Sequence, residues 1–383
     1  MNKHLKRLTA SLSALCLAAT FCSAISASAV TLYPKTVMTK SSTMWNSYRN
    51  QNIKLDYCTS KSDGKDYLFE PGRGIKVVST YQMYRDIYVD QNDISLLYAN
   101  KSYDYQQAAQ CALYNTEKAY DFLKNAGYKP NGGDIFVAIN DISTYSPNGN
   151  GGERENAWGK DNTIFLGMGS SNQNTESSVK FLGAATDTVT HEYMHLITGE
   201  KLGWDSYGTG SKYRERNALM EAYSDIMAEL ADERGDWKVG TTVFTKNSSR
   251  SENNKYSFRN LAVPGDTINP KTSGLKYYGD YYAWLRVCNI DPDSTLNAVC
   301  GSTVISHAAY LMHQKGYSND VLAKIWMKSV DKFNKSKAST ATFSDCRKAF
   351  NEAAIEVLSQ TAGRYYNAQV LDLMSCFDEV GVK

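Results

Sequence analysis

His191-Glu192-Tyr193-Met194-His195 places two imidazoles and a carboxylate within little more than one turn of a helix. Residues four apart on an α-helix share a face, so the rings of His191 and His195 can converge on one ion. Neutral imidazole is a common ligand of Zn²⁺, and Glu192 can take a proton from an attacking water. The pentapeptide also occurs by chance, so a zinc site requires a third ligand elsewhere in the chain.

That third ligand is expected in Glu221-Ala222-Tyr223-Ser224-Asp225, which lies inside a helix-favouring run over 217–230. Glu221 and Asp225 are one turn apart and share a face. We predict Glu221 as the third ligand and Asp225 as the carboxylate that accepts a hydrogen bond from the second ring nitrogen of His191. Two histidines, a glutamate and an open position are typical of catalytic zinc. The alternative is an ordinary amphipathic helix with its acids in solvent.

With these residues the chain resembles the thermolysin-like neutral metallopeptidases. The resemblance rests on H-E-x-x-H followed by E-A-x-S-D, and it extends to Asn156-Ala157-Trp158, to Ser306-His307-Ala308-Ala309-Tyr310 and to the run 349–382. It implies an α+β fold. A β-rich N-terminal domain would cover 30–185, and a central zinc-binding helix with an α-helical C-terminal domain would cover 186–383.

The resemblance also implies the activity and several residue roles. A secreted zinc endopeptidase would use Glu192 as general base on protein or peptide substrates and would cleave before bulky apolar residues. Asn156 and Ala157 would lie along the substrate backbone as an edge strand. Arg259 would lie beside the substrate carbonyl, and Tyr213 would supply a hydroxyl. Read from the residues alone, Asn156 could be a turn residue and Arg259 an ordinary surface charge.

One position departs from the family. Counting back from Ala308-Ala309, Val299 stands where the family has a histidine that stabilises the oxyanion. Losing one such donor costs on the order of 100- to 1,000-fold in rate. The resemblance therefore predicts a slow or selective peptidase, with a catalytically impaired zinc protein acting as a binding module as the alternative. An aminopeptidase is disfavoured because no extra acidic motif precedes the histidines.

Calcium sites are only partly preserved. Asp187, Asp232 and Asp236 match calcium-ligand positions of the family, whereas Lys238 and Thr241 stand where further carboxylates are expected. Calcium takes six or more oxygen ligands, and an ammonium group in the cluster repels the ion. At most one Ca²⁺ is expected.

The first 29 residues are typical of a secretory signal. A basic start precedes an apolar stretch over 8–24, and Ala27-Ser28-Ala29 fits the small-x-small cleavage rule. The apolar stretch is too short and too rich in Ser and Thr to favour a membrane anchor. Cleavage removes three basic residues and no acidic one, so the formal charge of +2 becomes −1. Neither nucleic acid nor membrane is indicated as a partner, and we expect a secreted monomer.

Six cysteines remain after that cleavage, and an even number in a secreted chain favours disulfides. Two helices expected over 343–358 and 365–380 would bring Cys346 and Cys376 together if they packed antiparallel. The other expected pairs are Cys288–Cys300, which bracket a short loop, and Cys58–Cys111 by elimination. The alternative is several buried free thiols.

Local patterns predict the remaining elements. Alternating or apolar runs favour short strands, Ala- and Leu-rich runs favour helices, and Gly199 is expected to end the central helix. The expected strands are 75–78, 87–89 and 135–139, and the expected further helices are 105–125 and the central one over 187–198.

Overall fold

The structure is a computed structural model that describes ten stretches of the chain. The expected signal peptide and the strand expected over 87–89 lie outside these residues. Within the described part, no helix is long and apolar enough to cross a membrane. The described stretches are 37–47, 49–61, 64, 66–79, 104–140, 155–170, 179–244, 257–266, 278–288 and 295–383.

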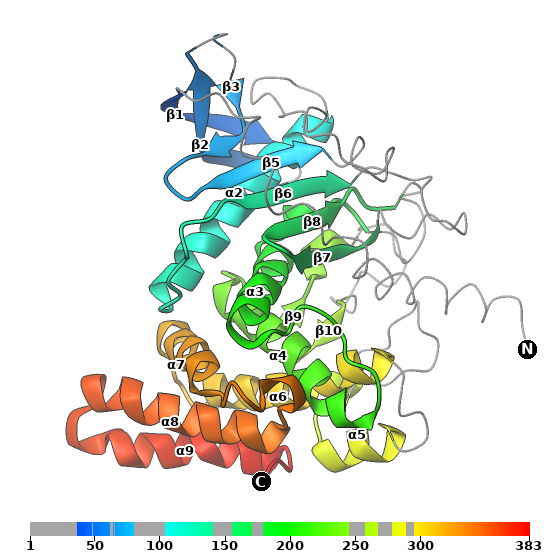
Figure 1. The fold of residues 1–383 in the computed structure, drawn as a ribbon, viewed down its shortest axis with the longest axis vertical. Helices are drawn as coiled ribbons and strands as arrows, with labels where there is room; N and C mark the ends of the chain where they lie inside the picture. The colour runs from blue at the N-terminus through cyan, green and yellow to red at the C-terminus, as the bar shows by residue number, and fades with distance from the viewer. Residues whose placement is uncertain are drawn as a thin grey trace, which may run out of the picture. The chain divides into compact units, whose positions relative to one another are not determined.

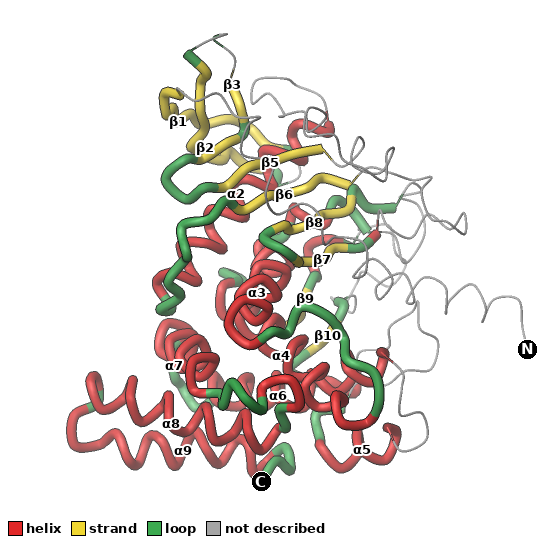
Figure 2. The backbone as a smooth tube through the Cα atoms, viewed as in Figure 1, coloured by secondary structure: helices red, strands yellow, loops and turns green. Residues whose placement is uncertain are grey.

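The chain forms two compact units, and together they are α+β as predicted. The strand-containing unit comprises Met1–Asp121, Pro130–Leu196 and Thr242–Ser249, and the helical unit comprises Phe122–Lys129, Ile197–Thr241 and Arg250–Lys383. Figure 2 shows the strands gathered in the N-terminal part of the chain and helices in most of the C-terminal part.

The main sheet of the first unit has five strands in the order β4-β5-β6-β8-β7. Figure 1 labels β5, β6, β8 and β7 in this order. The centre of the sheet is parallel, because β5 pairs with β6 and β6 with β8 in that sense, whereas β4 and β7 run antiparallel to their neighbours. Buried central strands read as continuous apolar runs, as the sequences of β6 and β8 do. The bounds are β4 Phe69–Glu70, β5 Ile75–Ser79, β6 Ile135–Asn140, β7 Ala157–Lys160 and β8 Thr163–Gly167.

A second sheet of this unit has the order β1-β2-β3, and a long helix, α2, follows in sequence. Asn46 at the end of β1 donates to the Gln107 carbonyl of α2 at 2.7 Å, and Arg73 forms a two-point ion pair with Asp121 of the same helix. The bounds are β1 Val37–Asn46, β2 Gln51–Ser60, β3 Asp66–Tyr67 and α2 Asp104–Asn125.

The helix predicted around the H-E-x-x-H pentapeptide is α3, Thr186–Leu202. It runs past Gly199, contrary to the expected end there, and stops at Gly203, whose φ of 68° is left-handed. A glycine inside a helix costs only about 1 kcal/mol, which the packing of this helix offsets.

The helical unit is built around α4, Arg214–Ala231, in which every residue from Arg216 to Leu230 is buried. Tyr223 of α4 packs against Trp326 and Trp204 with ring centroids 5.4 and 6.2 Å away. Phe350 continues this aromatic core 4.6 Å from Trp326. The other helices are α5 Tyr281–Cys288, α6 Thr295–Gln314, α7 Asn319–Lys332, α8 Phe343–Thr361 and α9 Tyr366–Glu379, with a two-stranded sheet of β9 Lys238–Val239 and β10 Arg259–Asn260.

The antiparallel pair of C-terminal helices is present as α8 and α9 (Figure 1). The disulfides expected from this pair and from the other cysteines are not formed among the described side chains. Each sulfur whose contacts are described lies near another polar group: Cys346 Sγ is 3.7 Å from the Tyr223 hydroxyl, and Cys376 Sγ is 3.9 Å from the Asp372 carbonyl. The alternative of buried free thiols therefore holds for Cys58, Cys111, Cys300, Cys346 and Cys376.

Candidate metal centre

The two histidines of α3 direct the same ring nitrogen toward each other. His191 Nε2 and His195 Nε2 are 3.1 Å apart, with ring centroids 4.8 Å apart and ring planes at 82°. His191 is buried and His195 half-buried. Tetrahedral zinc with Zn–N bonds of about 2.0–2.1 Å separates two ligand nitrogens by about 3.3 Å. The observed separation fits a shared ion.

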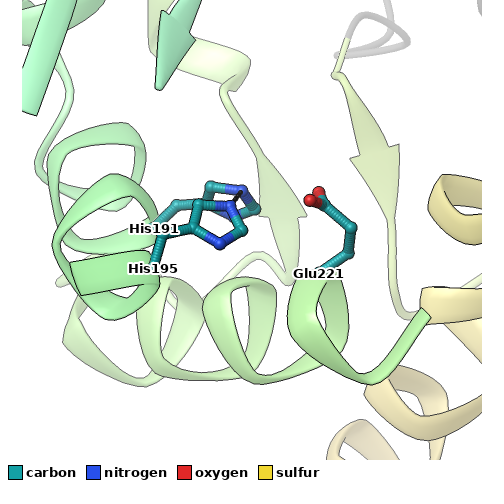
Figure 3. A group of neighbouring side chains, drawn as sticks. All are labelled: His191, His195 and Glu221. Carbon is teal, nitrogen blue, oxygen red and sulfur yellow. Dashed lines mark hydrogen bonds between the residues drawn. The ribbon is translucent and has the colours of Figure 1, made fainter. Parts of the chain in front are cut away.

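Glu221 of α4 completes a three-residue group. One ligand atom from each of His191, His195 and Glu221 lies within 4.8 Å of the other two. Figure 3 shows the Glu221 carboxylate pointing toward both imidazole rings. Two imidazoles and one carboxylate are the donor set that catalytic zinc sites use, so the residues fit this ion.

Two side chains fix the orientation of the Glu221 carboxylate. The Tyr207 hydroxyl donates to Glu221 Oε1 at 2.6 Å. Arg259 Nη2 lies 3.9 Å from Glu221 Oε2. Sequence reasoning missed Tyr207, because it precedes Glu221 in an irregular segment where no periodicity marks a side chain. Only the folded structure, in which its hydroxyl reaches Glu221, identifies Tyr207 as a site residue.

Arg259 and Asp225, both predicted as site residues, form a buried ion pair. Arg259 Nε and Nη2 each donate to one Asp225 oxygen at 2.6 Å. Ser302 of α6 places its hydroxyl 3.3 Å from Asp225 Oδ2 and 2.8 Å from the Val299 carbonyl. Val299 is one turn before Ser302 and shares its face of α6. The predicted role of Asp225 toward His191 stays a prediction.

The predicted base lies under the edge of the five-stranded sheet. Glu192 is buried, and its carbonyl oxygen lies so close to Gly159 of β7 that a Cβ on this glycine would collide with it. Asn156 accepts from Gly167 N at 3.0 Å, and Ala157 begins β7 opposite Leu166 of β8. Among the described strands, β7 is the last in its sheet, and an edge strand can pair with a further strand through its outer backbone groups.

Tyr213 does not contact Glu221 in the hydrogen bonds that the structure gives. It ends a short 3₁₀ turn, and its ring packs on Gly208, where a Cβ would overlap ring carbons. The Arg216 guanidinium lies 5.7 Å from the ring centroid. Tyr213 is therefore placed as a packing surface for the loop that carries Tyr207.

A second acidic group brings together two of the predicted calcium residues. Carboxylate oxygens of Asp187, Glu229 and Asp232 lie within 4.8 Å of one another. Asp236 is not in this group, since its carboxylate accepts from Lys238 N and from the Thr241 hydroxyl. Arg234 Nη2 lies 2.7 Å from Asp232 and brings one positive charge. Three oxygen donors suit calcium, but Arg234 competes with the ion at one of them.

The family comparison adds independent evidence. Residues 212–382 match the family model of the thermolysin metallopeptidase, alpha-helical domain. The resemblance to thermolysin-like metallopeptidases is confirmed. The matched segment includes Glu221, Asp225, Arg259 and Val299, whereas the histidine pair precedes it. No match was found among curated proteins.

Proposed function

We propose that this protein is a zinc-dependent metalloendopeptidase that hydrolyses peptide bonds in secreted form. The observation that carries the proposal is the convergence of His191, His195 and Glu221. The family match over the helical part of the chain supports the same activity. When bound, Zn²⁺ supplies a Lewis acid that polarises the scissile carbonyl and acidifies the attacking water.

The chain's own groups would do the rest of the chemistry. Glu192 would take the proton of the water on its carboxylate and pass it to the leaving amine nitrogen. Arg259, held by Asp225, would offer guanidinium N–H groups to the substrate carbonyl. Asn156 and Ala157 would bind the substrate backbone by strand addition at the edge of β7. Tyr213, predicted as a hydroxyl donor, would act through the loop that it supports.

Val299 favours a second candidate, a zinc protein that binds peptides with little turnover. A valine side chain offers no hydrogen bond to an oxyanion, and the loss of one such donor costs on the order of 100- to 1,000-fold in rate. The presence of Glu192 favours the peptidase over the peptide-binding protein, because peptide binding alone does not require a buried base beside the metal ligands.

We further propose that at most one Ca²⁺ is held, by Asp187, Glu229 and Asp232. Three clustered carboxylates, two of them fully buried, repel one another unless a cation neutralises them. Asp236, the third predicted ligand, would support the adjoining turn through its bond to Thr241.

The test is hydrolysis of casein and of quenched peptides by purified protein with its zinc content measured, beside Glu192→Gln. We expect one zinc per chain in both proteins. The activity of Glu192→Gln should be about 100- to 10,000-fold lower than that of the wild type. Bound zinc with background hydrolysis in both would favour the binding module. Wild-type protein without affinity for zinc would overturn both candidates.

A further inference from the structure

Residues 203–210 connect α3 to the 3₁₀ turn before α4, and Tyr207 is one of them. The Tyr207 hydroxyl reaches Glu221 Oε1 at 2.6 Å, a short bond of the kind made to a charged acceptor. Side chains outside this irregular segment hold its backbone. The contacts that fix it come from the first turn of α4.

Asn217 makes two of these contacts. Its Oδ1 accepts from Gly208 N at 3.0 Å, and its Nδ2 donates to Gly208 O at 2.8 Å. One side-chain amide thus satisfies both backbone polar groups of a single residue. Asn217 is buried, so these two bonds are shielded from competing water.

Two further side chains hold the same segment. Arg216 Nη1 donates to the Ser206 carbonyl at 2.5 Å, and the Tyr213 ring packs against Gly208. Arg216 is 5% exposed, and it forms no ion pair with any carboxylate in the described part of the chain. Burying an unpaired guanidinium is costly. The hydrogen bond from Arg216 to Ser206 therefore forms although burying the guanidinium costs desolvation free energy.

We propose that Asn217 is a positioning residue: with Arg216 and Tyr213 it clamps Ser206–Gly208 so that Tyr207 orients Glu221 for metal binding. The inference rests on the proposed function, since it takes Glu221 as a zinc ligand. Partners that orient a ligating carboxylate raise metal affinity by about 10- to 100-fold. The clamp makes that gain depend on a residue that never contacts the ion.

A merely structural role for Asn217 predicts something different. Loss of the Asn217 bonds would then lower stability without changing the metal affinity of the folded protein. If the clamp acts through Tyr207, its loss matters only while the Tyr207 hydroxyl is present. Zinc affinity in a double-mutant cycle separates the two cases.

The experiment measures zinc affinity by competition with a chromophoric chelator for wild type, Tyr207→Phe, Asn217→Ala and the double variant. We expect affinity to fall about 10- to 100-fold in Tyr207→Phe. Asn217→Ala should weaken binding in the same direction, by about 10-fold, and should add less than about twofold in the Tyr207→Phe background. Absorption spectra of the Co²⁺-loaded proteins should shift in both single variants.

Asn334→Ala is the matched control, because Asn334 also ties its own turn through Ser336 but is exposed in another part of the helical unit. Its zinc affinity should equal that of wild type. Wild-type affinity in Asn217→Ala, or an equal loss in both backgrounds, would overturn the clamp. If Asn217→Ala does not fold, wild-type affinity in Tyr207→Phe would overturn it instead. Failure of the wild type to bind zinc would overturn the proposed function itself.

Discussion

Val299 is the residue at which the proposed enzyme is expected to be limited. Its neighbour Ser302 reaches Asp225, so a side chain at 299 lies on the α6 face beside the Arg259–Asp225 pair. Val299→His would restore a hydrogen-bond donor there. We expect kcat for a quenched peptide to rise by about 10- to 1,000-fold with the zinc content unchanged. An unchanged kcat would show that another group already stabilises the oxyanion.

Glu117 makes the stability of the strand-containing unit depend on pH. This α2 side chain is buried, and desolvation raises the pKa of Glu117 to about 9, while Arg73 opposes the shift. Its Oε1 accepts no hydrogen bond. The folded state therefore keeps a proton that the unfolded state releases near its ordinary pKa. Stability is lost as pH rises from the unfolded pKa toward 9.

Glu117→Gln removes this proton linkage. We expect it to raise the free energy of unfolding at pH 8 by on the order of 1–3 kcal/mol and to leave it nearly unchanged at pH 4, by urea titration. Exposed Glu352→Gln is the control and should have little effect at either pH. Equal effects of Glu117→Gln at both pH values would show that packing, not protonation, is responsible.

Residue types and spacing predicted the three side chains that converge, because helix periodicity fixes which side chains share a face; the zinc they are proposed to hold stays a prediction. His191 and His195 follow from a four-residue step, and Glu221 from its helix. Glu229 and Tyr207 could not be predicted in the same way. Glu229 continues the four-residue step of Glu221 and Asp225, but that step does not show that it meets Asp187 and Asp232, and Tyr207 lies in a loop.

The contact between β7 and α3 gives a prediction at the level of elements. Gly159 is the point where the strand crosses over the Glu192 carbonyl, and no larger residue fits there without moving one of them. Gly159→Ala is expected to lower the thermal midpoint by several degrees and the peptidase activity by at least about 10-fold. Gly265→Ala is the matched control, since a Cβ there meets open space. A stable, fully active Gly159→Ala protein would contradict this packing.

Helices of the C-terminal half were predicted better than their cross-links. The periodic apolar pattern predicted the bounds of α4, α8 and α9 within a few residues, since a buried helix face requires apolar residues at regular three- and four-residue steps. The pairing of Cys346 with Cys376 was wrong. Antiparallel packing brings two helix ends together, but it does not set the rotation of each helix about its axis. That rotation directs Cys346 toward Tyr223.

For the whole molecule, the thermal midpoint is expected to respond to a calcium chelator but not to a reductant. EGTA treatment, followed by removal of the chelator and readdition of zinc alone, is expected to lower the thermal midpoint by several degrees, because loss of the proposed Ca²⁺ leaves Asp187, Glu229 and Asp232 mutually repelling. A reductant is expected to leave the midpoint unchanged, since the described cysteines are free. Differential scanning calorimetry measures both. A midpoint that falls with reductant would contradict the free thiols, and one indifferent to EGTA would contradict the calcium.

The buried thiols give the native chain its own reporters of opening. Burial raises the pKa of Cys111, in the strand-containing unit, to about 12, and it does the same to Cys346 in the helical unit. A thiol that is neither ionised nor accessible does not react with an alkylating reagent. Each cysteine becomes reactive only when its surroundings unfold. The order in which Cys111 and Cys346 are alkylated in mild urea therefore records which unit opens first, without any introduced label.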